Sequence, residues 1–143
     1  VLGGESEYMA GRLALKTCAL GYVSDEKRIA VIYNAADIYV LPSVEDNLPN
    51  TIMEAMACGV PCVGFRTGGI PEMIDHGKNG YVADFRKADD LAAGMHRLLC
   101  GDDYEAMSRA AVSKVHTHYS QQSVAMRYIE VYNETAAMKK YII

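Results

Sequence analysis

The sequence predicts an α/β domain: a Rossmann-like, doubly wound parallel sheet followed by a helical tail. Short apolar runs alternate with longer stretches of helical spacing, as expected for strands joined by helices. Residues 37–41 are almost continuously apolar, which suits a strand covered on both faces, as in a parallel sheet. From residue 88 onward the spacing is helical only. Neither a repeat nor a linker interrupts the chain, so residues 1–143 form a single expected domain.

The first half of the chain contains the elements with the clearest local signals. Residues 24–27 resemble a helix cap and first turn, and Ile29, Ile32, Tyr33 and Ala36 then form one apolar face. Asn50 is a suitable cap for a helix through Cys58, which Gly59 would end. The other predicted elements are a helix over 5–16, strands over 18–23, 61–65 and 80–83, a short helix ending at 76, and helices over 88–100, 103–118 and 120–138.

Composition excludes several classes of function. The 143 residues contain 14 basic and 18 acidic side chains, and a net charge of −4 argues against a nucleic-acid partner. No apolar run reaches the roughly 20 residues of a membrane-spanning helix. The cysteines at 18, 58, 62 and 100 form no C-x-x-C pair, so we expect small buried side chains in a reducing, cytoplasmic protein. His116 and His118 lie on different faces of a helix, and no zinc site is expected.

Ligands of open parallel sheets bind beyond the carboxyl ends of the strands, where loops 21–24, 43–50 and 66–71 are expected. The middle loop leads directly into a helix, whose N-terminus suits an anion such as a phosphate. Glu54 is the only charged residue in that helix. Two roles fit Glu54 equally well. Its carboxylate can accept hydrogen bonds from vicinal hydroxyl groups, as in a ribose. It can also be an acid in the first turn that the helix dipole stabilises by about 0.3–1 kcal/mol.

Several segments together resemble one family. The stretch DIYVLPSVEDNLPNTIMEAMACG and its continuation VPCVGFRTGGIPEMIDHGKNGYVAD are similar to the donor-binding segment of retaining glycosyltransferases of family 4, which have the GT-B architecture. LGYVSDEKRIAVIYNAADIYVLPS upstream and YSQQSVAMRYIEVYNETA near the end extend the resemblance over nearly the whole chain. The form EDNLPNTIMEAMACG is most similar to bacterial enzymes that build capsular or other surface polysaccharides.

The resemblance implies a pair of acids separated by seven residues, which places them at Asp46 and Glu54. The family usually has glutamate at the first place, whereas Glu45 is one position too early, so a loop shift would be needed to bring Glu45 into use. By resemblance, the first acid contacts the hydroxyls of the donor sugar. The second acid holds the nucleotide ribose.

The resemblance also implies further donor-binding residues. Backbone N–H groups of Asn47 and Leu48 would face the sugar and the diphosphate, Tyr22 and Val23 would frame the nucleobase, and Thr51 lies in the same helix as Glu54. Gly68 and Gly69 would lie near the same crevice, where glycine permits close backbone approach or an unusual turn.

The implied activity is a hexosyl-type transfer from a nucleotide-diphospho-sugar to a glycan or lipid-linked acceptor. No D-x-D pair occurs, so the expected reaction uses no metal and no cofactor. The start at 1–4 reads as the end of a strand, and we expect a fragment without the N-terminal acceptor domain and the upstream basic pair. Such a fragment would bind donor weakly and be inactive. Arg12 and Lys16 are expected on a solvated helix face. The full-length enzyme would associate peripherally with the inner face of the membrane.

Other functions fit parts of the pattern. A non-catalytic nucleotide-binding module, or a GT-B relative such as a sugar-nucleotide epimerase or a phosphorylase, would use the same crevice. A flavodoxin-like or response-regulator module ranks last, because neither its loop acids nor flavin-cradling loops are visible. In the tail, Val124, Tyr128, Val131 and Tyr132 form an apolar stripe that should fold onto this domain or drive self-association.

Overall fold

The computed structural model describes residues 1–139 and contains a parallel sheet of three strands in the order β1-β2-β3. The strands are β1 (Tyr39–Leu41), β2 (Cys62–Phe65) and β3 (Gly80–Ala83). Val40 of β1 pairs with Val63 of β2, which pairs in turn with Tyr81 of β3. The predicted doubly wound α/β fold is therefore confirmed.

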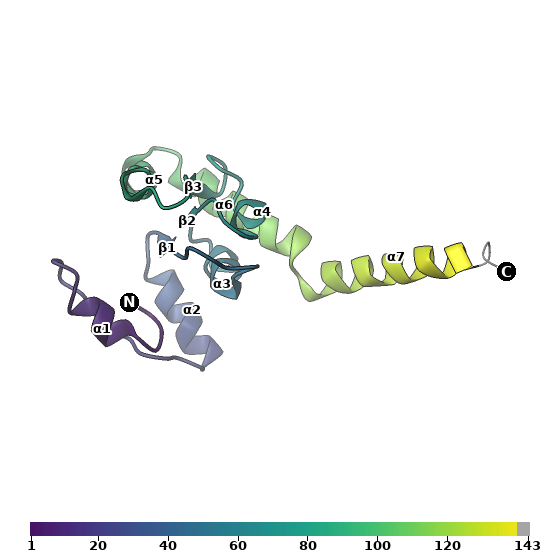
Figure 1. Ribbon diagram of the computed structural model, residues 1–143, viewed down its shortest axis with the longest axis horizontal. Coiled ribbons are helices and arrows are strands. Elements are labelled where there is room, and N and C mark those ends of the chain that lie inside the picture. Colours follow the sequence, from purple (N-terminus) through teal and green to yellow (C-terminus); the bar gives the residue numbers. More distant parts are fainter. Residues whose placement is uncertain (140–143) are drawn as a thin grey trace.

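Helices connect and follow the strands (Figure 1). α2 (Glu26–Asn34) precedes β1, α3 (Asn50–Ala57) joins β1 to β2, and α4 (Ile70–Met73) joins β2 to β3. After the sheet come α5 (Ala88–Cys100), α6 (Tyr104–His118) and α7 (Gln121–Lys139).

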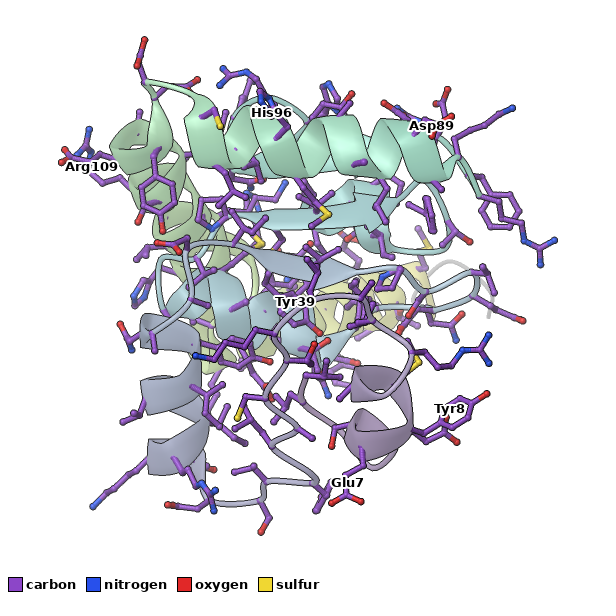
Figure 2. The ribbon with its side chains drawn as sticks, turned by 90° about the vertical axis from the view of Figure 1, so that its left-hand side faces the viewer. Glu7, Tyr8, Tyr39, Asp89, His96 and Arg109 are labelled. Carbon is purple, nitrogen blue, oxygen red and sulfur yellow. The ribbon has the colours of Figure 1, made fainter. Side chains whose placement is uncertain are left out.

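Side chains of successive strand residues point to opposite faces of the sheet, and both faces are covered. Cys62 packs with α3 and α4 in the larger core cluster, whereas the next residue, Val63, packs with Leu98 of α5 in a second cluster. Figure 2 shows α5 on one side of the sheet, with Asp89 and His96 labelled on it, and Tyr39 on the other side. Coverage of both faces explains why the strands are apolar at nearly every position.

α3 is the best-anchored helix near the expected site. Its buried residues Ile52, Ala55 and Met56 follow helical spacing and have no exposed surface. Gly59, with φ of +77°, ends the helix as predicted. The predicted cap is wrong, because Asn50 is the first helical residue and Pro49 occupies the cap position, where it has no hydrogen-bonding side chain.

The N-terminal segment differs from the sequence prediction. α1 covers only Ser6–Ala10, because Leu13 and Leu15 of the predicted 5–16 helix find no core and stay 44% and 78% exposed. Residues 18–23 form no strand. They bond to the first three residues through Leu20 N–Val1 O and Gly3 N–Gly21 O, both 2.9 Å, and Gly21 interrupts the extended backbone with φ of +67°.

α7 extends away from the rest of the molecule (Figure 1). Val124 is half-buried, but Tyr128, Val131 and Tyr132 remain 61%, 57% and 68% exposed. The apolar stripe is therefore not buried on this domain, although Tyr128 and Val131 line a groove beside Leu48. Its self-association remains a prediction.

The cysteines correct the expectation that all four are small buried side chains. All four are free thiols, but only Cys62 is fully buried, and burial raises the pKa of its thiol. Cys18 and Cys100 are exposed. Within residues 1–139 no helix has the length and apolar character needed to cross a membrane.

Candidate functional site

Two loops are tied together at the carboxyl ends of β1 and β2. The hydroxyl of Thr67, after β2, donates to the carbonyl of Val44, after β1, at 3.2 Å. Gly69 N–H donates to the carbonyl of Asp46 at 3.3 Å. The first loop leads into α3, so these bonds fix Asp46 beside the N-terminus of that helix.

The two glycines of the second loop are needed for this contact. A Cβ atom on Gly68 would overlap the carbonyl oxygen of Asp46, and one on Gly69 would overlap that of Asn47. Gly68 also has φ of +49°, which side chains disfavour. The close backbone approach expected at Gly68 and Gly69 is thus an approach between two loops of the protein.

A cavity of about 430 Å³ opens between the N-terminal segment and the β1–α3 unit, and we call it the Glu54 cavity. Its size lies in the range of small-molecule sites. It is lined by Leu2, Gly3, Tyr22, Val23, Ser24, Glu26, Ile29, Tyr39, Thr51 and Glu54.

Glu54 is exposed, whereas Ile52, Ala55 and Met56 on the inward face of the same helix are buried. Its Oε2 accepts a hydrogen bond of 3.2 Å from the hydroxyl of Tyr33 on α2. Tyr33 is only 2% exposed. Burial, then the nearby Tyr39 and Glu54, raise the pKa of Tyr33.

Tyr39 of β1 is a second tyrosine in the wall of the Glu54 cavity. Burial raises the pKa of Tyr39, a hydrogen bond with Thr51 opposes this, and the charges of Glu54 and Asp46 add to the increase. Tyr39 packs edge-on against Tyr33, with ring centroids 5.6 Å apart and an interplanar angle of 80°.

The residues predicted from sequence fall into separate groups. Four of them line the Glu54 cavity: Tyr22, Val23, Thr51 and Glu54. A second group, Asp46, Asn47, Gly68 and Gly69, forms the paired loops at the strand ends. Leu48 lines a different groove, beside Val124 and Tyr128 of α7, and Glu45 is exposed.

Sequence reasoning missed the roles of Tyr33 and Tyr39 at this site. Tyr33 was correctly expected on the apolar face of its helix, but its hydroxyl bonds to a residue 21 positions away. No spacing rule relates a residue of one helix to a partner on the next. The ten tyrosines give no signal either, because Tyr33 is the only one that is buried among the described residues.

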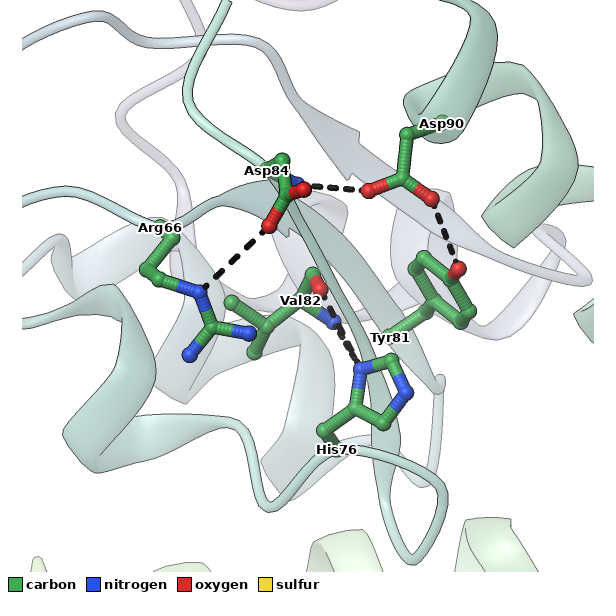
Figure 3. A network of polar contacts seen from close by, with 6 residues as sticks. All are labelled: Arg66, His76, Tyr81, Val82, Asp84 and Asp90. Carbon is green, nitrogen blue, oxygen red and sulfur yellow. Dashed lines mark hydrogen bonds and ion pairs between the residues drawn. The ribbon is translucent and has the colours of Figure 1, made fainter. Parts of the chain in front are cut away.

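A further polar network lies at the end of β3 (Figure 3). Asp90 accepts from the hydroxyl of Tyr81 at 2.8 Å and from the backbone N–H of Asp84 at 2.6 Å. The backbone bond, followed by the Tyr81 bond, lowers the pKa of Asp90. Arg66, after β2, lies 3.8 Å from Asp84, and both side chains are largely exposed, so this pair adds little stability. The network fastens the start of α5 to the sheet.

Among the described residues, no three histidine, cysteine, aspartate or glutamate side chains gather in a way that could hold a metal ion.

Comparison with known proteins supports one family. The family model for glycosyl transferases group 1 matches residues 1–101. A D-inositol 3-phosphate glycosyltransferase from Corynebacterium jeikeium is 36% identical over 72% of this chain, which covers 25% of that relative. The amylovoran biosynthesis glycosyltransferase AmsK from Erwinia amylovora is 34% identical over 78% of this chain, which covers 29% of that relative.

A solved structure has the same fold. The Anabaena protein Alr3699/HepE, determined in complex with UDP, superposes over 93% of this chain with a TM-score of 0.76 at 20% identity, and 40% of that chain is covered. The chain thus spans less than half the length of each of these similar proteins.

Proposed function

The chain belongs to the group 1 glycosyl transferases with the GT-B fold, and from this premise we propose that it is the donor-binding half of a hexosyltransferase. The donor is a nucleotide-diphospho-sugar. The transfer retains the anomeric configuration and requires no metal. The product belongs to a bacterial surface polysaccharide.

The observation that carries the proposal is the Glu54 cavity. The exposed carboxylate of Glu54 and the Tyr22–Val23 loop both line this space of about 430 Å³. A carboxylate accepts two hydrogen bonds from vicinal hydroxyl groups, so Glu54 suits a ribose. A nucleobase would then lie against Tyr22 and Val23, whose main-chain atoms distinguish bases weakly.

The sugar and diphosphate extend from the ribose toward the paired loops. Cleavage of the bond between the anomeric carbon and the phosphate oxygen leaves negative charge on the nucleoside diphosphate and positive charge on the sugar. Backbone N–H groups at the N-terminus of α3, and those of Asn47 and Leu48 before it, stabilise the negative charge on the nucleoside diphosphate. Asp46, whose carbonyl accepts the Gly69 N–H bond between the paired loops, would be the first acid and lie near the positive charge on the sugar, whereas Glu45 is exposed.

Similar proteins support the finer parts of the proposal. The HepE structure contains UDP, and AmsK is named for the synthesis of amylovoran. The acceptor, a glycan or a lipid-linked sugar, would bind to an N-terminal domain outside this chain, and peripheral contact of the full-length enzyme with the membrane would present it. We also propose a cytoplasmic location.

Transfer by the full-length enzyme tests the proposal. UDP-, GDP- and ADP-hexoses are offered with glycan and lipid-linked acceptors, with and without EDTA, and the anomeric proton of the product is observed by NMR. We expect transfer with retained configuration that EDTA does not change, and none by the 143-residue chain alone. Asp46→Asn should lower the rate about 100-fold or more, and Glu45→Gln less than threefold. An inverted product, or loss of activity in EDTA, contradicts the proposal.

A further inference from the structure

We propose that Tyr33 is a positioning residue for the donor ribose: its buried hydroxyl holds one oxygen of Glu54 so that the carboxylate is presented to the Glu54 cavity. This inference rests on the proposed function, because it assumes that Glu54 binds the ribose.

The geometry places Tyr33 behind the ligand rather than against it. Glu54 lines the Glu54 cavity and also a smaller neighbouring cavity of about 260 Å³, whose walls include Tyr33 and Cys58. Tyr33 lines only the smaller of these two. Its hydroxyl therefore reaches Oε2 of Glu54, at 3.2 Å, from the smaller cavity and not from within the larger one.

The direction of the bond is fixed by chemistry. An ionised carboxylate has no proton to give, so the phenol is the donor. Burial raises the pKa of Tyr33, and its proton stays in place throughout the physiological range. Oε2 thus accepts this bond, while Oε1 has no hydrogen-bond partner within residues 1–139.

Holding the carboxylate matters because Glu54 is otherwise free to turn. Its side chain is exposed, has three rotatable bonds and belongs to no ion pair within the described residues. Tyr33 is rigid by comparison, since it is 2% exposed and its ring packs on Tyr39. A carboxylate anchored in advance loses less conformational freedom when the ligand binds.

The test measures ribose recognition with Tyr33→Phe, which keeps the ring and removes only the hydroxyl. Tyr81→Phe is the matched control, because it removes a phenol–carboxylate bond of 2.8 Å, to Asp90, away from the cavity. Each variant and the wild type are titrated with UDP, GDP and ADP. The nucleotide that binds best is then compared with its 2′-deoxy analogue, and Glu54→Ala and the double variant Tyr33→Phe/Glu54→Ala complete a cycle.

We expect Tyr33→Phe to weaken binding of the ribonucleotide about 3- to 10-fold, the range of one hydrogen bond, and to bring the ribo-to-deoxyribo affinity ratio toward one. Tyr81→Phe should change neither quantity. With Glu54 already replaced by alanine, the Tyr33→Phe change should have no further effect.

Two results overturn the inference, and they are distinguishable. If Glu54→Ala weakens binding while Tyr33→Phe leaves the affinity ratio unchanged, Tyr33 does not position Glu54 and the proposed function stands. If the wild type binds none of the three nucleotides, or Glu54→Ala binds as the wild type does, the ribose role of Glu54 fails and the inference fails with it.

Discussion

Replacement of Gly68 by alanine tests whether contact between the two loops holds the site together. The new Cβ atom would overlap the Asp46 carbonyl oxygen, so the loops must separate and the bond from Gly69 N–H to that oxygen is lost. Holding an alanine in the left-handed backbone conformation costs about 1–2 kcal/mol of folding free energy. The lost bond adds about 1 kcal/mol. We expect Gly68→Ala to lower the free energy of unfolding by about 2–3 kcal/mol.

Gly77→Ala is the matched control. Gly77 has φ of +78°, but nothing lies within 4 Å of the position its Cβ would occupy, so this change carries the backbone cost without the overlap. Urea unfolding followed by circular dichroism measures both variants, and linear extrapolation gives their stabilities. Gly68→Ala should be the less stable by about 1 kcal/mol or more. Equal stabilities would refute the idea that the loops are packed against each other through Gly68.

Three further changes test the core, the α5 contact and the tail. Ile52→Ala removes a side chain with no exposed surface and should cost about 2–5 kcal/mol in urea unfolding, whereas Val31→Ala, at a position 68% exposed, should cost less than about 0.5 kcal/mol. The pKa of Asp90 is lowered below its ordinary 3.8, so its carboxylate stabilises the fold above that pH and loses this effect as the pH falls. The difference in unfolding free energy between the wild type and Asp90→Asn should therefore become smaller below about pH 4. A difference that does not change with pH would contradict a stabilising role for the Asp90 hydrogen bonds. Tyr132→Ser should leave stability within about 0.5 kcal/mol and weaken self-association in sedimentation experiments, and a wild type that is monomeric at every concentration would contradict the prediction for the tail.

The sheet was predictable because its strands carry their own signal. Residues 37–41 are apolar at nearly every position since helices cover both faces, and the actual strand Tyr39–Leu41 lies within that run. Gly59 likewise ends α3 through a local conformation that the sequence indicates. Features that are determined by neighbouring residues could be predicted from the local sequence.

The failed predictions depend on partners far along the chain. Residues 18–23 have the apolar character of a strand, but hydrogen bonds to the first three residues and the turn at Gly21 keep them out of the sheet. Leu13 and Leu15 have helical spacing without a surface to cover. Spacing shows which side chains could share a face, and it does not show whether another element packs on that face.

The candidate site shows the same division. Sequence resemblance predicts Asp46 and Glu54 as the acids, and the structure places Glu54 in the cavity wall and Asp46 in the paired loops before α3. The bond from Tyr33 to Glu54 crosses from one helix to another and required coordinates.

Calorimetric titration of the chain with UDP, GDP and ADP, repeated with Glu54→Ala and Glu45→Ala, tests the central claim most directly. The two glutamates are both exposed, but only Glu54 lines the cavity. We predict that one nucleotide binds, that Glu54→Ala weakens it about tenfold or more, and that Glu45→Ala leaves it unchanged. Binding that survives Glu54→Ala, or binding lost only with Glu45→Ala, would contradict the assignment of this cavity to the donor nucleotide.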